Sequence, residues 1–97
     1  MNEFHGFGIS AQPEVKTSES GTKYATFGLG IKEKPSSKNF TFFKVVCFDE
    51  QADFVEKYLL KKGTNKIFVH GRLKKDEVDE SFYIIAQRIH FLPNFSG

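Results

Sequence analysis

The sequence predicts one all-β domain, a barrel of five strands with a single α-helix between the third and the fourth strand. Three stretches show residue types that repeat at every second position, as in strands, and two further stretches, one at each end of the chain, are interpreted as strands. One stretch, between the third and fourth of these, has the wider apolar spacing of an amphipathic helix, and turn-forming residues separate the elements. A chain of 97 residues supports one hydrophobic core, so residues 1–97 are expected to form a single domain.

The first two strands are separated by a polar loop. The first is expected at Phe4–Ile9, and Pro13 is expected to end it, because proline cannot donate a hydrogen bond within a sheet. The second is expected at Thr22–Lys32, with a core face formed by Ala25, Phe27, Leu29 and Ile31. Its other face holds Tyr24 and two glycines, which should leave a shallow trough beside the neighbouring strand.

The third strand, expected within Asn39–Glu50, is apolar on both faces. The odd face suits a core and consists of Thr41, Phe43, Val45 and Cys47. The even face places Lys44 among the apolar residues Phe40, Phe42, Val46 and Phe48. A strand of this kind is either buried on both sides or uses one side to bind a ligand, and periodicity alone does not choose between these possibilities.

The helix follows directly, and two strands complete the chain. Asp49 is expected to cap the helix and Gly63 to end it. Its core positions are Ala52, Val55, Tyr58 and Leu59. The last strands are expected at Lys66–Lys75 and Phe82–Leu92, joined by an acidic turn. This order is that of the OB-fold barrel, which binds oligonucleotides around its second and third strands, although fold alone does not establish function.

Composition excludes several classes of function. The formal charge of +2 is too small for a global basic field, so attraction for phosphate must come from local clusters. A single cysteine, Cys47, excludes an internal disulfide and a cysteine-based zinc site, and its place on an apolar face favours a buried thiol over a nucleophile. The histidines His5, His70 and His90 are far apart in the sequence. We therefore expect no enzyme activity, catalytic residues, metal or cofactor, and, without an apolar leader or membrane span, a cytoplasmic protein.

A candidate binding surface combines aromatic rings with cations on the outward faces of the strands and in the loop between the second and third strands. Its members are Tyr24, Lys32, Lys34, Lys38, Phe40, Phe42, Lys44, Phe48, Arg72 and Lys74. Rings and cations in this arrangement suit single-stranded nucleic acid, whose bases stack on rings while its phosphates meet Lys and Arg. Two other interpretations remain open: the rings could pack under the helix or in a subunit interface, and the lysines could belong to an ordinary solvated loop.

Five segments of the sequence carry a resemblance to a known family. They are Pro13–Val15 (PEV), Ser20–Ile31 (SGTKYATFGLGI), Phe42–Gly63 (FFKVVCFDEQADFVEKYLLKKG), Val69–Asp76 (VHGRLKKD) and Ala86–Leu92 (AQRIHFL). In this order they are similar to the bacterial single-stranded DNA-binding protein family, over nearly the whole chain. The resemblance implies base stacking on Phe42 and Phe48, with Lys44 between them and Lys16 and Arg72 as further basic residues. It also implies a homo-oligomer, a dimer or tetramer assembled through the first strand.

The sequence departs from the family in three places. The basic residue that is common before Pro13–Val15 is missing, and Ala11 and Gln12 stand there instead. The family often has an aromatic residue between its fourth and fifth strands, where this chain has Val78 within an acidic run, Asp76–Glu80. The acidic tail that recruits partner proteins in the family is not seen before Gly97, so either the tail has been cut from this sequence or the chain is a short form of the family. The expected function is sequence-tolerant binding of single-stranded DNA in replication, recombination or repair, in a cytoplasmic, nucleoid-associated protein. The alternative is a protein-interaction module, as in primosome assembly or mobile elements, with replication proteins as partners and little DNA binding.

Overall fold

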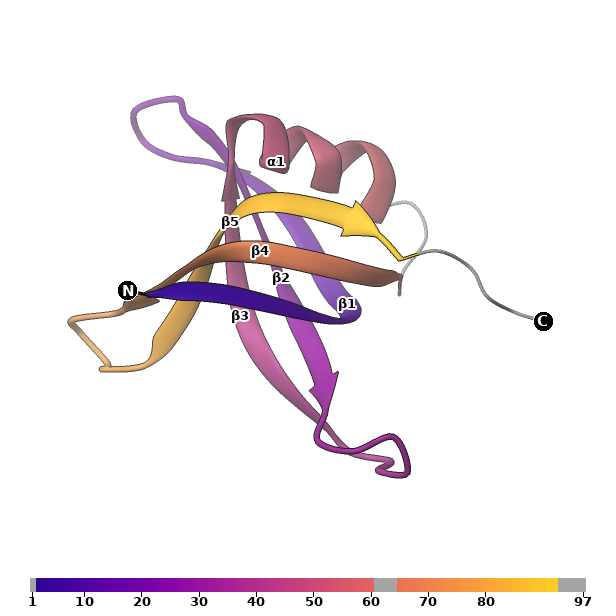
Figure 1. The fold of residues 1–97 in the computed structure, drawn as a ribbon. Helices are drawn as coiled ribbons and strands as arrows, with labels where there is room; N and C mark the ends of the chain where they lie inside the picture. Colours follow the sequence, from indigo (N-terminus) through magenta and orange to yellow (C-terminus); the bar gives the residue numbers. More distant parts are fainter. Residues whose placement is uncertain (1, 61–64, 93–97) are drawn as a thin grey trace.

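Five strands form a closed barrel in the computed structural model, which describes residues 2–60 and 65–92 (Figure 1). The elements are, in chain order, β1 (Glu3–Thr17), β2 (Lys23–Lys32), β3 (Phe40–Phe48), α1 (Asp49–Phe54, continued by a π-helix over Val55–Leu59), β4 (Lys66–Lys75) and β5 (Phe82–Phe91). The order around the barrel is β1-β2-β3-β5-β4, and only the β3–β5 pair is parallel. The predicted fold class is therefore confirmed. No helix in residues 2–60 and 65–92 has the length and apolar character to cross a membrane.

Strand β1 is much longer than the sequence predicted. The prediction that it ends before Pro13 is wrong, because Pro13 lies at an irregularity between Ala11 and Glu14 where the register with β2 shifts. Gln12 has a φ of 50° at this point. A bulge leaves a residue outside the regular ladder, so a residue without an N–H is tolerated there. The second half of β1 thereby continues along β2 and adds its outward side chains to the face that β2 and β3 share.

The barrel closes because β1 bends from one neighbour to the other. Residues before Ile9 pair with β4, residues after it pair with β2, and Ile9 is aligned with both Lys66 and Gly30. Gly8 allows the backbones of β1 and β2 to approach closely at this bend, since a Cβ there would clash with the carbonyl oxygen of Gly30. The buried Ser10 secures the crossing by donating its N–H to the carbonyl of Asn65 at 2.8 Å.

The core lies inside the barrel and under the helix. Its buried apolar residues are Ala25, Phe27, Leu29, Val45, Cys47, Ala52, Val55, Leu59, Ile67, Val69, Ile84, Ala86 and Ile89. The alternation in β2 thus predicted the inward face correctly, with Ile31 partly buried at its margin. Thr41 was assigned to the core and is exposed, because it lies where β3 runs beyond the barrel toward its connection with β2.

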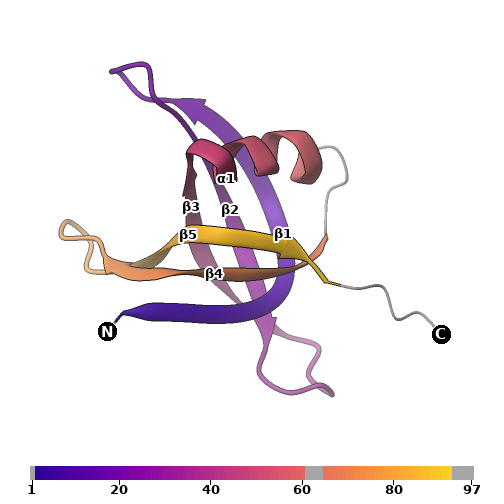
Figure 2. The ribbon, with the colours of Figure 1, turned by 45° about the horizontal axis from the view of Figure 1, so that its top comes forward.

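The helix lies against one end of the barrel (Figure 2). Asp49 is not its cap: Phe48 holds the N-cap position without a side-chain hydrogen bond, and Asp49 is the first helical residue. Tyr58 was expected in the core but is exposed, where its ring packs against Phe54 at a centroid distance of 5.0 Å. Leu59, which was also expected in the core, is buried, and the π-helical turn that contains it is closed by the bond from Leu60 N–H to the Val55 carbonyl. The predicted end at Gly63 lies outside the described residues.

Candidate nucleic-acid interface

An exposed phenylalanine ring, Phe42, rests on a glycine surface on the outward face of β2 and β3, toward the end of this face that lies near the β2–β3 connection. Gly30 is the cross-strand partner of Phe42, and Gly28 is the partner of Lys44. A Cβ at Gly30 would come within 2.7 Å of Cε1 of Phe42, so only glycine leaves room for the ring in this position. The Phe42 side chain is nevertheless 56% exposed. A large apolar ring held in place by the backbone and open to solvent is suited to stack on a flat ligand.

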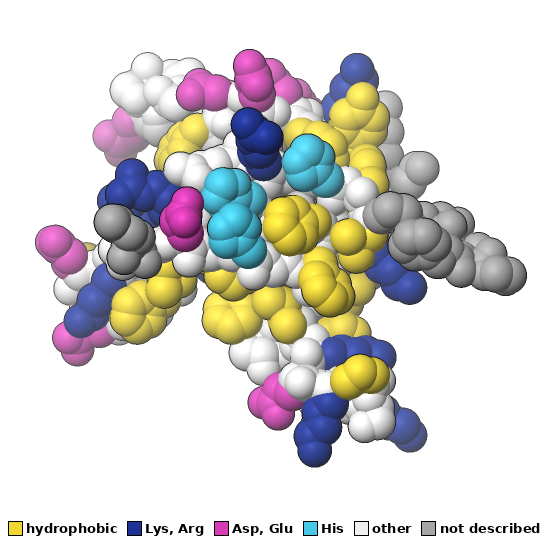
Figure 3. Space-filling model, viewed as in Figure 1, with side chains coloured by type: hydrophobic (Ala, Val, Ile, Leu, Met, Phe, Trp, Pro, Cys, Tyr) yellow, Lys and Arg dark blue, Asp and Glu magenta, His cyan; other side chains and the backbone are white. Residues whose placement is uncertain are grey.

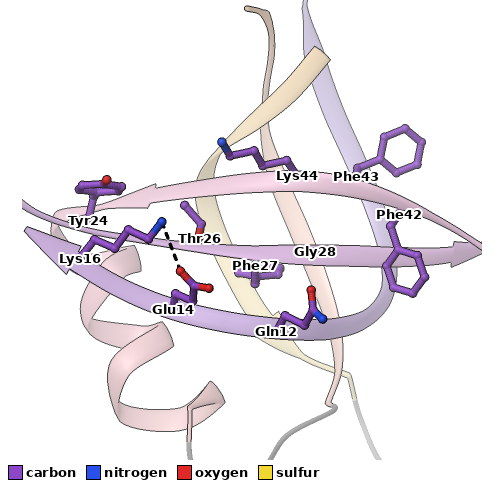
Figure 4. A pocket seen from close by; sticks show the side chains of 10 residues that line it. All are labelled: Gln12, Glu14, Lys16, Tyr24, Thr26, Phe27, Gly28, Phe42, Phe43 and Lys44. Atoms are coloured by element: carbon purple, nitrogen blue, oxygen red, sulfur yellow. Dashed lines mark ion pairs between the residues drawn. The ribbon is translucent and has the colours of Figure 1, made fainter. Parts of the chain in front are cut away.

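A shallow groove of about 420 Å³ begins at this ring and runs along the same face (Figure 4). It is lined by Gln12, Glu14, Lys16, Tyr24, Thr26, Phe27, Gly28, Phe42, Phe43 and Lys44. Phe42 lies toward one end of this set and Tyr24 with Lys16 toward the other, while Lys44 lies along one side. The groove therefore has an aromatic group toward each end, with Lys16 beside Tyr24 and Lys44 along one side, a combination that suits a single nucleic-acid strand.

Two aromatic pairs stand on this face, one toward each end of β3. The rings of Phe40 and Phe42 have centroids 6.1 Å apart, and those of Tyr24 and Phe48 are 6.3 Å apart. Phe48 is 40% exposed, so both of the rings singled out by the family resemblance reach solvent. Lys32 Nζ lies 5.6 Å from the centroid of the Phe40 ring, a cation–π distance. The fold thus brings together the candidate residues predicted on β2 and β3.

The remaining candidates lie outside the groove. Lys34 and Lys38 are exposed in the connection between β2 and β3, where basic side chains gather at the lower end of the view in Figure 3. Lys74 is aligned with Tyr83 on β5, which is in turn aligned with Lys44, so Lys74 continues the row of Lys44 around the barrel. Arg72 lies further around the barrel, aligned with Glu3 on β1. These cations can extend a path that leaves the groove.

The model of the Single-strand binding protein family matches residues 1–92 of this chain. The chain belongs to this family. No curated protein sequence matches the chain.

Solved structures of single-stranded DNA-binding proteins share the fold of this family member. The chain is 22% identical to a deletion mutant of the Thermus aquaticus protein at a TM-score of 0.77, covering 98% of this chain but 43% of that one. The chain is 15% identical to the Saccharomyces cerevisiae mitochondrial protein Rim1 at a TM-score of 0.79, covering 96% of this chain and 95% of that one. It is 15% identical to the SSB domain of a Synechococcus protein at a TM-score of 0.76, covering 93% of this chain and 94% of that one. At these identities the comparison shows the fold alone.

Several residues of the groove were not predicted. Gln12 and Glu14 line it from β1, and they were missed because the sequence placed the end of β1 at Pro13. The alternation of Glu14, Val15 and Lys16 was the available signal, since Val15 packs on the core and its neighbours point outward. Glu14 forms an ion pair with Lys16 at 3.2 Å, and its negative charge partly neutralises Lys16. This end of the groove is therefore less basic than Lys16 alone would make it.

The two features considered for catalysis have different outcomes. Cys47 is fully buried, and this burial raises the pKa of its thiol to about 12, so the thiol remains protonated and unreactive as expected. The histidines are far apart in the sequence, but the fold brings two of them together. The rings of His5 and His70 stack with centroids 4.2 Å apart, and Glu3 lies beside them.

Proposed function

We propose that this protein binds single-stranded DNA with little sequence preference and without catalysing a reaction. The observation that carries the proposal is the exposed Phe42 ring on its glycine surface, next to Lys44 and the groove. Every base has a π-face, so stacking on a fixed ring attracts bases of all kinds, and each stacked base contributes about 1–3 kcal/mol. Membership of the Single-strand binding protein family supports this function.

Base stacking is assigned first to Phe42 and Phe48, the two exposed rings of β3. Phe40 and Tyr24 are the partners that pack beside them, at 6.1 Å and 6.3 Å between centroids. A ring supported by a second ring keeps its orientation when a base arrives, so less side-chain freedom is lost on binding. A strand lying along β3 would meet the two pairs in succession.

Phosphate neutralisation is assigned to the lysines along this path and to Arg72. Lys44 lies beside the groove, Lys32, Lys34 and Lys38 lie at the β2–β3 connection, and Lys74 continues the row of Lys44. Each contact with a phosphate releases counterions, which lowers log K by roughly 0.7 for every tenfold increase in salt. Duplex DNA cannot present unstacked bases to the rings, so it should bind through this electrostatic attraction alone.

A titration with fluorescently labelled oligo-dT and with a duplex of equal length tests the proposal. At low salt we expect tight binding of oligo-dT, much weaker binding of the duplex, and a linear fall of log K with log salt for the single strand. Equal affinity for both nucleic acids, or no binding of oligo-dT at low salt, would contradict it. As the cellular setting we propose replication, recombination or repair and an association with the nucleoid.

We also propose that the protein assembles into a dimer or tetramer through β1. In the described residues, the first half of β1 pairs with β4 on one edge, and Phe7 is 66% exposed on this part of the strand. An open strand edge offers unpaired N–H and C=O groups to another copy. Light scattering should therefore give a multiple of the 11.1 kDa chain mass, and a mass of one chain at micromolar concentration would reject the assembly.

A second candidate function is that of a protein-interaction module with weak DNA binding. The acidic connection between β4 and β5 favours it, because four of its five residues from Asp76 to Glu80 are carboxylates that repel phosphate. This candidate predicts that the protein recovers a replication protein in a pull-down while its affinity for oligo-dT stays close to its affinity for duplex DNA.

A further inference from the structure

Two histidines and a glutamate form a cluster on β1 and β4, away from the groove. The imidazole rings of His5 and His70 are nearly parallel, with an interplanar angle of 13° and 4.2 Å between centroids. Nε2 of His70 is 3.7 Å from a carboxylate oxygen of Glu3. One potential ligand atom from each of the three residues lies within 4.8 Å of the other two. Figure 3 shows histidine side chains gathered on this face beside an acidic one.

The strand register explains why these residues meet. Glu3 and His5 are two positions apart on β1 and therefore point to the same side of the sheet. His70 is the direct cross-strand partner of His5, a position in which Cβ atoms are separated by about 4.5–5.5 Å. The Leu73 N–H also donates to the Asn2 carbonyl at 2.6 Å, which holds the start of β1 against β4. Side chains carried by two paired strands are held more precisely than side chains on loops.

The chemistry of the cluster suits a transition-metal ion. Nε2 of His70 is buried from solvent and has no hydrogen-bond partner in the described residues, although an imidazole nitrogen normally finds one. Two imidazoles and one carboxylate are the protein ligands of a known class of zinc site, in which a fourth position is left to water. Imidazole nitrogen favours Zn²⁺, Cu²⁺ and Ni²⁺, whereas Mg²⁺ and Ca²⁺ prefer sites made of oxygen atoms.

The charged neighbours of the cluster also bear on its selectivity. Arg72 is the cross-strand partner of Glu3, and Arg88 is the partner of His70. These cations reduce the purely electrostatic attraction for any metal ion, so binding must come from coordination by the imidazoles. Cys47 is fully buried and cannot compete as a soft ligand.

We propose that Glu3, His5 and His70 bind one Zn²⁺ ion per chain. The ion would join the first half of β1 to β4, in addition to the backbone pairing and the stacked rings of His5 and His70. It would act as a structural clip that stabilises the start of β1, since an ion that binds the folded state and not the unfolded chain raises stability. The site is independent of the groove and of the DNA-binding proposal.

The test is calorimetric titration of the full chain, prepared without a histidine tag and freed of metal, with ZnCl₂. We expect one equivalent of Zn²⁺ per chain, a higher melting temperature with Zn²⁺, and no such response to Mg²⁺. His5→Gln and His70→Gln should each weaken binding by more than the roughly 10–100-fold that loss of an outer-shell partner costs. His90→Gln is the matched control, because His90 is exposed and is not a member of the cluster.

A spectroscopic measurement keeps the test decisive if a variant folds poorly. Co²⁺ added to the wild-type chain should give the visible absorption bands of a four-coordinate site, and His90→Gln should retain them. The proposal is overturned if micromolar Zn²⁺ does not bind, if His5→Gln binds as tightly as wild type, or if the stoichiometry is one ion per two chains.

Discussion

Two connections on the same barrel have opposite charge, and they project from it in different directions (Figure 1). The β2–β3 connection and its flanks, Lys32–Lys44, hold four lysines and one glutamate. The β4–β5 connection, Asp76–Ser81, holds four carboxylates and no lysine or arginine. Both connections border the outward face that contains Phe42, because β3 pairs with β2 on one side and with β5 on the other. We propose from this contrast that the barrel supplies the stacking rings and that the connections decide where the DNA strand enters and leaves the face.

The two connections also differ in how their charges are held. Asp76 accepts a hydrogen bond from the Val78 N–H at 2.8 Å, and Asp79 accepts from both the hydroxyl and the N–H of Ser81 at 2.6 and 2.9 Å. The Ser81 hydroxyl, its N–H and the nearby charge of Lys44 lower the pKa of Asp79, so its carboxylate stays ionised. In the described residues no ion pair involves the lysines of Lys32–Lys44, so these remain available to phosphate.

The largest expected effect separates a ring on the basic side from a ring on the acidic side. Phe42 and Phe82 are almost equally exposed, at 56% and 57%. Phe82 precedes Tyr83, the residue aligned with Lys44, so it points to the other side of the sheet. We expect Phe42→Ala to weaken binding of oligo-dT by about 1–3 kcal/mol, roughly 5- to 150-fold, and Phe82→Ala to leave it nearly unchanged.

Fluorescence anisotropy with the same oligo-dT measures both variants. Circular dichroism of each variant checks that the barrel is intact. We expect both variants to fold, because both side chains are exposed. Equal losses in the two variants would mean that the rings contribute by general hydrophobicity and not by their place on the β2–β3 face.

The next effect comes from the lysines of the basic connection. Replacing Lys32, Lys34 and Lys38 together with Gln should weaken binding at low salt and reduce the slope of log K against log salt by up to about 2, since each single-strand phosphate contact contributes about 0.7. The measurement is a series of titrations over a range of salt concentrations. A variant with Lys57→Gln and Lys66→Gln, which lie on the helix and at the start of β4, should keep the wild-type slope. An unchanged slope in the triple variant would show that the bound DNA strand does not cross this connection.

A smaller effect tests how β2 positions the stacking ring. A methyl group at Gly30 would meet Cε1 of Phe42 at 2.7 Å and Cγ1 of Ile9 at 3.1 Å, so the ring must turn away and the crossing of β1 is crowded. Gly30→Ala should weaken oligo-dT binding by less than Phe42→Ala and lower stability by about 1–3 kcal/mol, the cost of overpacking. Gly28→Ala is the control, because the nearest atoms there lie at 3.6 and 3.7 Å, which is ordinary contact.

Urea unfolding and the anisotropy titration separate the two consequences of Gly30→Ala. If the variant binds oligo-dT as tightly as wild type while it loses stability, the orientation of the Phe42 ring does not matter for stacking.

The sequence predicted the rings of the candidate site because their positions depend on local periodicity. Phe42 and Phe48 follow Phe40, the first residue of β3, by two and eight positions. These spacings are even, so the alternation of the strand places both rings on the same outward face as Lys44. The match of β4 with its predicted bounds, Lys66–Lys75, has the same origin. Period-two alternation is a property of the strand itself and needs no knowledge of its neighbours.

The features that the sequence did not predict depend on pairing between distant segments. Gln12 and Glu14 reach the groove only because β1 continues through an irregularity at Pro13, which sequence alone marks as an end. His5 and His70 are aligned by the register between β1 and β4, and a shift of one residue would place them on opposite faces. The register between strands about 60 residues apart in the sequence is set by the whole barrel, so no local sequence pattern predicts it.

The smallest expected effect is a gain of affinity when the acidic connection loses charge. If the DNA strand passes near this connection, each carboxylate repels its phosphates and raises the free energy of the complex. A unit charge about 10 Å from a phosphate costs roughly 0.4 kcal/mol in water, which is about twofold in affinity. Asp79→Asn and Glu80→Gln together should therefore tighten oligo-dT binding roughly fourfold at low salt. Asparagine can still accept the hydrogen bonds from Ser81, so the turn should persist.

Salt and pH distinguish this repulsion from a change in structure. The gain should vanish near 1 M salt, where the Debye length is about 3 Å, whereas a rearranged turn would act at every salt concentration. Because the pKa of Asp79 is lowered, the gain from Asp79→Asn should persist as pH falls and disappear only below the ordinary range of an aspartate. Glu56→Gln, which removes one charge from the helix, should change affinity less than Asp79→Asn. If both single variants bind alike at low salt, the strand stays away from the β4–β5 connection and only the basic connection directs it.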